Sequence, residues 1–135
     1  MSDDDSRPLF TYDHYETGRS YGMEEFTFDN PVLAKWQKVY PGDGHGGIMP
    51  GGMLAMIVLD AVLKLHSPRP PGGIHAGQTF EVLRLPRLGE SMLTEVICIG
   101  KEIRKERRFV RVRTRTCSLF GEELFTGTMI TIVAA

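Results

Sequence analysis

The stretch from residue 50 to residue 66, PGGMLAMIVLDAVLKLH, restricts the possible fold more than any other part of the sequence. After Pro50 and two glycines, every residue from Met53 to Val62 is apolar except Asp60. A surface helix has one apolar and one polar side, so a helix that is apolar almost all round must be covered on most sides. The segment is too short, and too interrupted by charge, to span a membrane. We therefore predict a central, largely buried helix.

The sequence after this helix has the pattern of strands. In one segment Arg111, Arg113 and Arg115 alternate with valine and threonine, as in a sheet with one covered face. The strands are longer than usual, and curvature around one helix explains such lengths. They are predicted at Ile74 to Leu85, Met92 to Ile103, Phe109 to Phe120 and Leu124 to Val133. The sequence thus predicts an α+β fold, in which a long curved antiparallel sheet wraps around the central helix.

The segment before the central helix contains a short strand, a short helix and a glycine-rich loop. The strand is predicted at Met23 to Phe28, and Asp29 and Pro31 are favourable residues for opening the helix that follows. Residues 41 to 47, PGDGHGG, fit neither a helix nor a strand, and their glycines let backbone approach a ligand closely. Asp43 and His45 carry the acid–base groups of this loop, so they are the candidates for proton transfer.

Composition and charge are those of an ordinary globular protein. We expect one domain, residues 1–135, with residues 1–10 disordered. The net charge of −1 gives no reason to expect nucleic acid as a partner. The first residues show no pattern of a signal peptide or membrane anchor, and Cys98 and Cys117 lack a metal-binding spacing. Free thiols are typical of a cytoplasmic protein, which is the location we expect.

Half of the 16 lysines and arginines lie between Lys101 and Arg115. This run is interpreted either as a solvated face whose charges protect the sheet edge, or as a docking patch for phosphates or for an acidic partner protein. His66 is expected at the C-terminal end of the central helix, where a positive charge is favourable.

Four short motifs occur in an order and at spacings that resemble a known family. They are Thr27-Phe28-Asp29 before the first helix, Gly42-Asp43 in the glycine-rich loop, Met49-Pro50-Gly51-Gly52-Met53-Leu54 at the start of the central helix, and Leu88-Gly89-Glu90 at a turn. Together they resemble the MaoC-like hydratases and dehydratases, over roughly residues 15 to 133. The resemblance implies a single hot-dog domain, which is the architecture that the strand and helix pattern also predicts.

The resemblance implies an enzyme, a lyase that hydrates a 2-enoyl thioester or removes water from a 3-hydroxyacyl thioester. It implies that Asp43 and His45 handle the protons, and that backbone amides at the helix start polarise the thioester carbonyl. The first amides of a helix lack partners within it and lie at the positive end of its dipole, so Gly51 and Gly52 are the predicted donors. We expect no metal and no cofactor beyond the coenzyme A or carrier-protein phosphopantetheine of the substrate.

Two residues of the first strand after the central helix, His75 and Gln78, are candidates for substrate binding. In most members of this fold that strand is a neighbour of the helix, so a polar side chain there could face the site. An exposed strand position is the alternative interpretation of both residues.

The sequence departs from the family in the glycine-rich loop. Members of the family have Asn-Pro between the Asp and the His, whereas here only Gly44 separates Asp43 from His45. Two other functions therefore stay open. Hot-dog thioesterases place a carboxylate on the central helix, and Asp60 is an acid there, although it also fits an i,i+4 pair with Lys64. The chain could instead be a non-catalytic acyl-binding subunit of a two-chain dehydratase.

A lone unit of this kind leaves a sheet edge and one side of its helix open. We therefore predict at least a homodimer, or an assembly with a heteromeric partner subunit, and no membrane or nucleic-acid partner.

Overall fold

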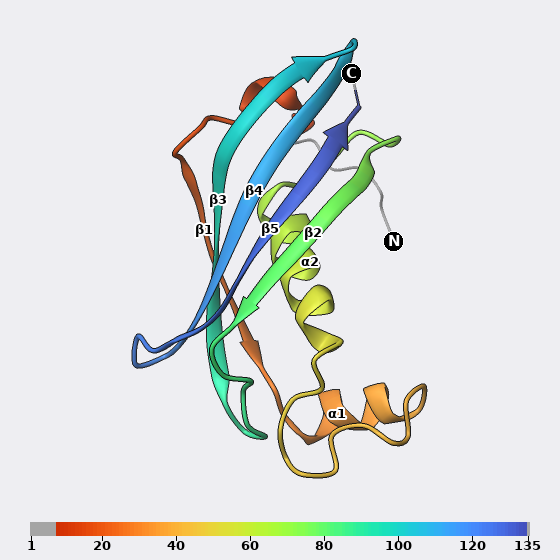
Figure 1. Ribbon diagram of the computed structural model, residues 1–135, viewed down its shortest axis with the longest axis vertical. Coiled ribbons are helices and arrows are strands. Elements are labelled where there is room, and N and C mark those ends of the chain that lie inside the picture. Colours follow the sequence, from red (N-terminus) through yellow and green to blue (C-terminus); the bar gives the residue numbers. More distant parts are fainter. Residues whose placement is uncertain (1–7, 135) are drawn as a thin grey trace.

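A five-stranded antiparallel sheet curves around one helix in the computed structural model of the chain, which describes residues 8–134 (Figure 1). The strand order is β1-β3-β4-β5-β2, and each neighbouring pair is antiparallel. The elements are a 3-10 helix at Tyr12–His14, β1 at Ser20–Thr27, α1 at Asn30–Gln37, α2 at Met53–Leu65, β2 at Ile74–Val82, β3 at Ser91–Arg104, β4 at Arg107–Ser118 and β5 at Glu123–Val133. The predicted α+β architecture is confirmed.

The central helix α2 packs against β1 and β3 on the inner face of the sheet. Its inward residues are Met53, Leu54, Ile57, Val58, Ala61 and Val62, all buried. Its other side is less covered than the apolar sequence predicts, because Met56, Leu59 and Leu63 are 40%, 37% and 42% exposed. These three residues, spaced three and four apart, form an apolar stripe that the described part of the chain leaves uncovered.

The sheet follows the period-two pattern of the sequence. Val110, Val112 and Thr114 of β4 are buried on the inner face, and the arginines that alternate with them are exposed on the outer face. Hydroxyls also occur on the inner face, where Thr94 and Thr116 are paired across β3 and β4. Their side-chain oxygens lie 2.8 Å apart and are buried, so each hydroxyl satisfies the other.

Helix α1 begins where the sequence predicts. The side chain of Asp29 accepts a hydrogen bond from the Val32 amide at 3.0 Å, and Pro31 occupies the first turn, where its missing N–H costs nothing. Leu33 is the buried residue of this helix. The helix ends at Gln37, before the glycine-rich loop, and lies beside the start of α2 at the lower end of the molecule (Figure 1).

The C-terminal end of α2 is sealed by aromatic rings. His66 is fully buried, with Phe10 stacked on it at 4.6 Å and Tyr15 and Tyr21 set edge-on at 4.9 and 4.6 Å between ring centroids. Burial, and secondarily the positive charge of Arg69, lowers the pKa of His66 from 6.5 to about 4. The expectation of a positive charge at this helix end was therefore wrong, because the surrounding rings exclude water from the imidazole.

The rings around His66 also bear on the predicted disorder of residues 1–10. Residues 1–7 lie outside the described part of the chain. Phe10 lies within the described part: its amide donates to the Pro68 carbonyl at 2.6 Å, and its ring packs on His66. The prediction of disorder is therefore wrong for Phe10. Within residues 8–134, no helix combines the length and the apolarity that a bilayer crossing requires.

Candidate functional site at the start of the central helix

The backbone amides at the start of α2 differ in their hydrogen bonds. Gly52 caps the helix with helical backbone angles, and no side chain accepts from this end. The amides of Met53 and Leu54 donate to the carbonyls of Pro50 and Gly51 at 3.0 and 3.2 Å. The amides of Gly51 and Gly52 have no backbone acceptor among residues 8–134. Amides at this position carry the positive end of the helix dipole, so they suit a carbonyl or anionic oxygen.

The two glycines have different surroundings. A side chain at Gly51 would meet no atom within 4 Å, so this residue faces open space. A Cβ at Gly52 would lie 3.1 Å from Cζ2 and 3.2 Å from Cη2 of Trp36. The indole therefore covers one side of Gly52, and the open approach to the helix start is at Gly51.

Asp43 is held by the end of α1. Its Oδ2 accepts a hydrogen bond from Trp36 Nε1 at 3.0 Å, and its backbone carbonyl accepts one from Gln37 Nε2 at 2.9 Å. The Asp43 amide donates to the Tyr40 carbonyl at 3.1 Å. The carboxylate is half-buried and one indole ring away from Gly52. Trp36 thus connects the Asp43 carboxylate to the start of α2, through a hydrogen bond on one side and a packing contact on the other.

The loop that carries Asp43 requires glycine at position 44. Gly44 has a φ of +76°, a backbone conformation that residues other than glycine adopt only at an energetic cost. A Cβ there would also lie 2.6 Å from Cδ1 of Leu33, too close for any real contact. Gly44 therefore lets the loop lie directly on α1.

His45 points away from this arrangement. It is exposed, and its Nε2 lies 2.6 Å from the Pro41 carbonyl oxygen. A carbonyl only accepts, so Nε2 carries the hydrogen and donates, which leaves Nδ1 of the neutral ring as an acceptor. Among the hydrogen bonds of residues 8–134, none joins His45 to Asp43. The structure thus places the two predicted proton-transfer residues in one loop but with different partners.

A second loop, between β2 and β3, fixes the chain that follows His45. The Met49 amide donates to the Pro86 carbonyl at 2.9 Å, and the Leu88 amide donates to the Gly47 carbonyl at 2.8 Å. Arg84 holds this second loop by ion pairs with Glu90 at 2.8 Å and Glu122 at 2.9 Å. The guanidinium lowers the pKa of both carboxyl groups from their usual value. The start of α2 is therefore anchored on two sides, by α1 and by this ion-paired loop.

The predicted substrate-binding residues lie along β2, apart from the glycine-rich loop. His75 is exposed, with Nε2 3.1 Å from the Gly77 carbonyl oxygen, and it lines a hollow of about 280 Å³ together with Leu59 and Leu63 of α2. Gln78 donates from Nε2 to the Thr79 carbonyl at 3.0 Å, while its Oε1 is buried without a partner among the described residues. Neither side chain hydrogen-bonds to the Asp43 loop in that part of the chain.

Asp60, the alternative catalytic carboxylate, forms an ion pair with Lys64 at 2.9 Å. Both side chains are about half exposed, at 51% and 55%. The i,i+4 interpretation of this pair is confirmed. Among residues 8–134, no group of three or more His, Cys, Asp or Glu side chains is placed to hold a metal ion.

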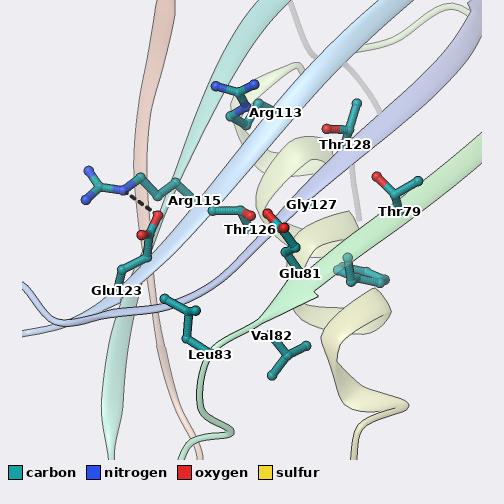
Figure 2. A pocket seen from close by; sticks show the side chains of 11 residues that line it. Thr79, Glu81, Val82, Leu83, Arg113, Arg115, Glu123, Thr126, Gly127 and Thr128 are labelled. Atoms are coloured by element: carbon teal, nitrogen blue, oxygen red, sulfur yellow. Dashed lines mark hydrogen bonds and ion pairs between the residues drawn. The ribbon is translucent and has the colours of Figure 1, made fainter.

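A hollow of about 750 Å³ lies on the outer face of the sheet, over β2, β4 and β5 (Figure 2). Arg113 and Arg115 line it together with threonines of β5, and Arg115 is paired with Glu123 at 3.0 Å. In Figure 2 these side chains project on the side of the sheet opposite α2. Part of the basic run therefore faces away from the helix, and this hollow is separate from the site at Gly51.

Comparison with solved structures identifies the architecture. An (R)-hydratase from A. caviae involved in PHA biosynthesis superposes with a TM-score of 0.73 at 17% identity, over 89% of this chain and 98% of that one. The MaoC-like dehydratase of Rhodospirillum rubrum gives 0.73 at 15% identity, over 93% and 97%. A hypothetical thioesterase from Streptococcus pneumoniae gives 0.63 at 12% identity, over 84% and 81%. This chain has the hot-dog fold. No protein-family model and no curated protein sequence matches it.

Within the hot-dog fold of this chain, sequence analysis missed the role of Trp36. The indole covers Gly52, as an apolar side chain of α1 would. The ring also binds Asp43, however, which lies seven residues further along the chain. The sequence does contain a signal for this contact. Pro41 and Gly42 form a turn between Trp36, the only tryptophan of the chain, and Asp43, and this turn returns the chain toward α1.

Proposed function

We propose that this hot-dog protein is an acyl-thioester hydratase or dehydratase, a lyase acting on 2-enoyl or 3-hydroxyacyl thioesters of coenzyme A or of an acyl carrier protein. The observation that carries the proposal is that Trp36 binds the carboxylate of Asp43 and also covers Gly52, at a helix start where two amides have no backbone acceptor among residues 8–134. The shared fold of an (R)-hydratase and a MaoC-like dehydratase supports this reaction class. The open approach at Gly51 suits a thioester oxygen.

In the hydration direction, the thioester carbonyl accepts hydrogen bonds from the amides of Gly51 and Gly52. These bonds stabilise the negative charge that develops on the oxygen as C3 is attacked. Asp43 removes a proton from the attacking water, so that the C3–O bond forms. His45, protonated as imidazolium, donates a proton to C2 and becomes neutral, and the proton on Asp43 returns to His45 through solvent. Because the His45 ring is bound to the Pro41 carbonyl in the structure, this step requires the ring to turn away from that carbonyl. Dehydration is the same sequence in reverse.

The test is the loss of enoyl-thioester absorbance when the protein is mixed with crotonyl-CoA. Asp43→Asn is expected to lower kcat/KM by about 10²–10⁴, the usual contribution of a general acid or base. Asp13→Asn is the matched control, because Asp13 is an exposed carboxylate in the 3-10 helix. Full activity in Asp43→Asn would remove Asp43 from the mechanism.

A thioesterase that uses Asp60 is the second candidate. It is favoured by the hot-dog fold of the hypothetical thioesterase and by the exposure of Asp60 beside the apolar stripe of α2. Release of free thiol from acyl-CoA, abolished in Asp60→Asn, would establish this function in place of the first. Ligand binding without turnover, followed by turnover when a second chain is added, would instead identify a non-catalytic acyl-binding subunit.

We propose that two copies associate through the edge strand β2. Its outer edge has no neighbouring strand among the described residues, and the apolar stripe of Met56, Leu59 and Leu63 runs along the same side of the molecule as His75. Pairing of two such edges would extend the sheet and cover the stripe. A monomer in sedimentation equilibrium at micromolar concentration would contradict this assembly.

A further inference from the structure

Trp36 makes three different contacts at the start of α2. Its Nε1 donates to Asp43 at 3.0 Å, the edge of its six-membered ring covers Gly52, and its ring lies 4.8 Å from that of Tyr40 at an interplanar angle of 34°. The indole N–H donates only, and a carboxylate only accepts, so this hydrogen bond has one possible direction. One side chain therefore connects the acid–base loop to the helix amides.

We propose that Trp36 is a positioning residue, which fixes the Asp43 carboxylate over the helix start and closes the side of Gly52 so that a substrate oxygen enters at Gly51. This proposal rests on the proposed hydratase or dehydratase function. Trp36 does not itself react. It sets the distance and direction between the group that moves a proton and the amides that stabilise the developing charge.

The support of Trp36 makes this role possible. Helix α1 is fixed at its start by the Asp29 cap and in its middle by the buried Leu33, and its last turn carries the indole. Gln37, the next residue, holds the backbone of Asp43 from the same turn. Trp36 is the one side chain among residues 8–134 that hydrogen-bonds to the carboxylate of Asp43. The carboxylate direction therefore depends on this one donor.

The helix start shows why the two glycines are not equivalent. At Gly51 a methyl group would enter open space, whereas at Gly52 it would press on the indole at 3.1 Å. Gly52→Ala should therefore displace Trp36 and, through it, Asp43. Gly51→Ala should leave the indole where it is. This pair of substitutions separates an effect through Trp36 from an effect on the helix itself.

The first measurement does not depend on enzyme activity. Because Trp36 is the only tryptophan, an ¹H–¹⁵N spectrum of the full chain contains one indole signal. Asp43→Ala removes the acceptor and should shift that signal and speed its exchange with solvent. Asp13→Ala should leave the signal unchanged. An indole signal that is the same in Asp43→Ala as in the wild type would overturn the proposal.

The second measurement uses turnover of crotonyl-CoA by Trp36→Phe, which keeps an aromatic ring against Gly52 but lacks the donor. Loss of a hydrogen bond to a charged group, with the misplacement that follows, predicts a fall in kcat of about tenfold to a hundredfold and a change in KM of less than about threefold. Unchanged kcat in a folded Trp36→Phe would overturn the proposal. If the wild type has no activity while the indole responds to Asp43→Ala and Gly52→Ala, the contact stands and the proposed function falls.

Discussion

The two ends of α2 have opposite surroundings. At the C-terminal end, His66 is enclosed by Phe10 and two tyrosines, with both ring nitrogens buried and without partners among the described residues. At the N-terminal end, Gly51 faces open space, and the nearby His45 is exposed. One end thus excludes water from an imidazole, while the other leaves amides and an imidazole accessible. The comparison indicates that the sealed end contributes stability and that the open end is available for chemistry.

The largest expected effect is at the sealed end. Tyr15→Ala should lower the free energy of unfolding by about 3–5 kcal/mol, the usual cost of removing a buried aromatic ring, because Tyr15 is 2% exposed. Urea denaturation measures this loss. Tyr40→Ala is the matched control at the open end: Tyr40 is 51% exposed, so the loss should stay below about 1 kcal/mol. Equal losses would remove the proposed difference between the ends.

The next effect is the pH dependence of stability that His66 produces. Its pKa is about 4 in the folded protein and 6.5 for a histidine exposed to water, so the unfolded chain binds the additional proton between these values. This contribution to the free energy of unfolding is complete above pH 6.5 and falls by about 3 kcal/mol as the pH drops to about 4. Denaturation at a series of pH values measures it. His66→Phe should remove this slope, and an unchanged slope would show that His66 is not its source.

A smaller effect is expected where the ion-paired loop anchors the open end. Glu90→Gln should lower the free energy of unfolding by about 1–2 kcal/mol, because it weakens a bidentate hydrogen bond from Arg84. It should also speed amide exchange at Met49 and Leu88, which join the two loops. Glu122→Gln removes the more exposed partner of the same guanidinium, so its effect should be smaller. The reverse order would mean that the second loop does not hold the helix start.

The smallest effect on stability is expected at His45. His45→Ala should change the free energy of unfolding by less than about 0.5 kcal/mol, because the ring is exposed and its hydrogen bond is to Pro41 of its own loop. Turnover should nevertheless fall if His45 donates the proton to C2. Thermal unfolding and the crotonyl-CoA assay, on the same preparation, measure the two effects. A strongly destabilised His45→Ala with normal turnover would assign His45 a structural role.

Local patterns in the sequence were enough to predict the architecture. Alternation along the strands predicted β4, and the cap at Asp29 predicted the start of α1, because each depends on residues that are close in the chain. The surroundings of His66 could not be predicted in this way, since Phe10 reaches it from far along the sequence. The direction of His45 depends on the backbone of the glycine-rich loop, including a φ of +76° at Gly44, for which periodicity gives no information.

The buried pair of Thr94 and Thr116 has a consequence for how β3 and β4 find their alignment. A slip by one residue would turn every apolar side chain outward, so the hydrophobic pattern alone prevents it. A slip by two residues keeps each side chain on its own face, and the pattern cannot distinguish it from the native pairing. It would, however, separate two buried hydroxyls that now satisfy each other at 2.8 Å. The threonine pair thus favours the native register of the two longest strands over a register shifted by two residues.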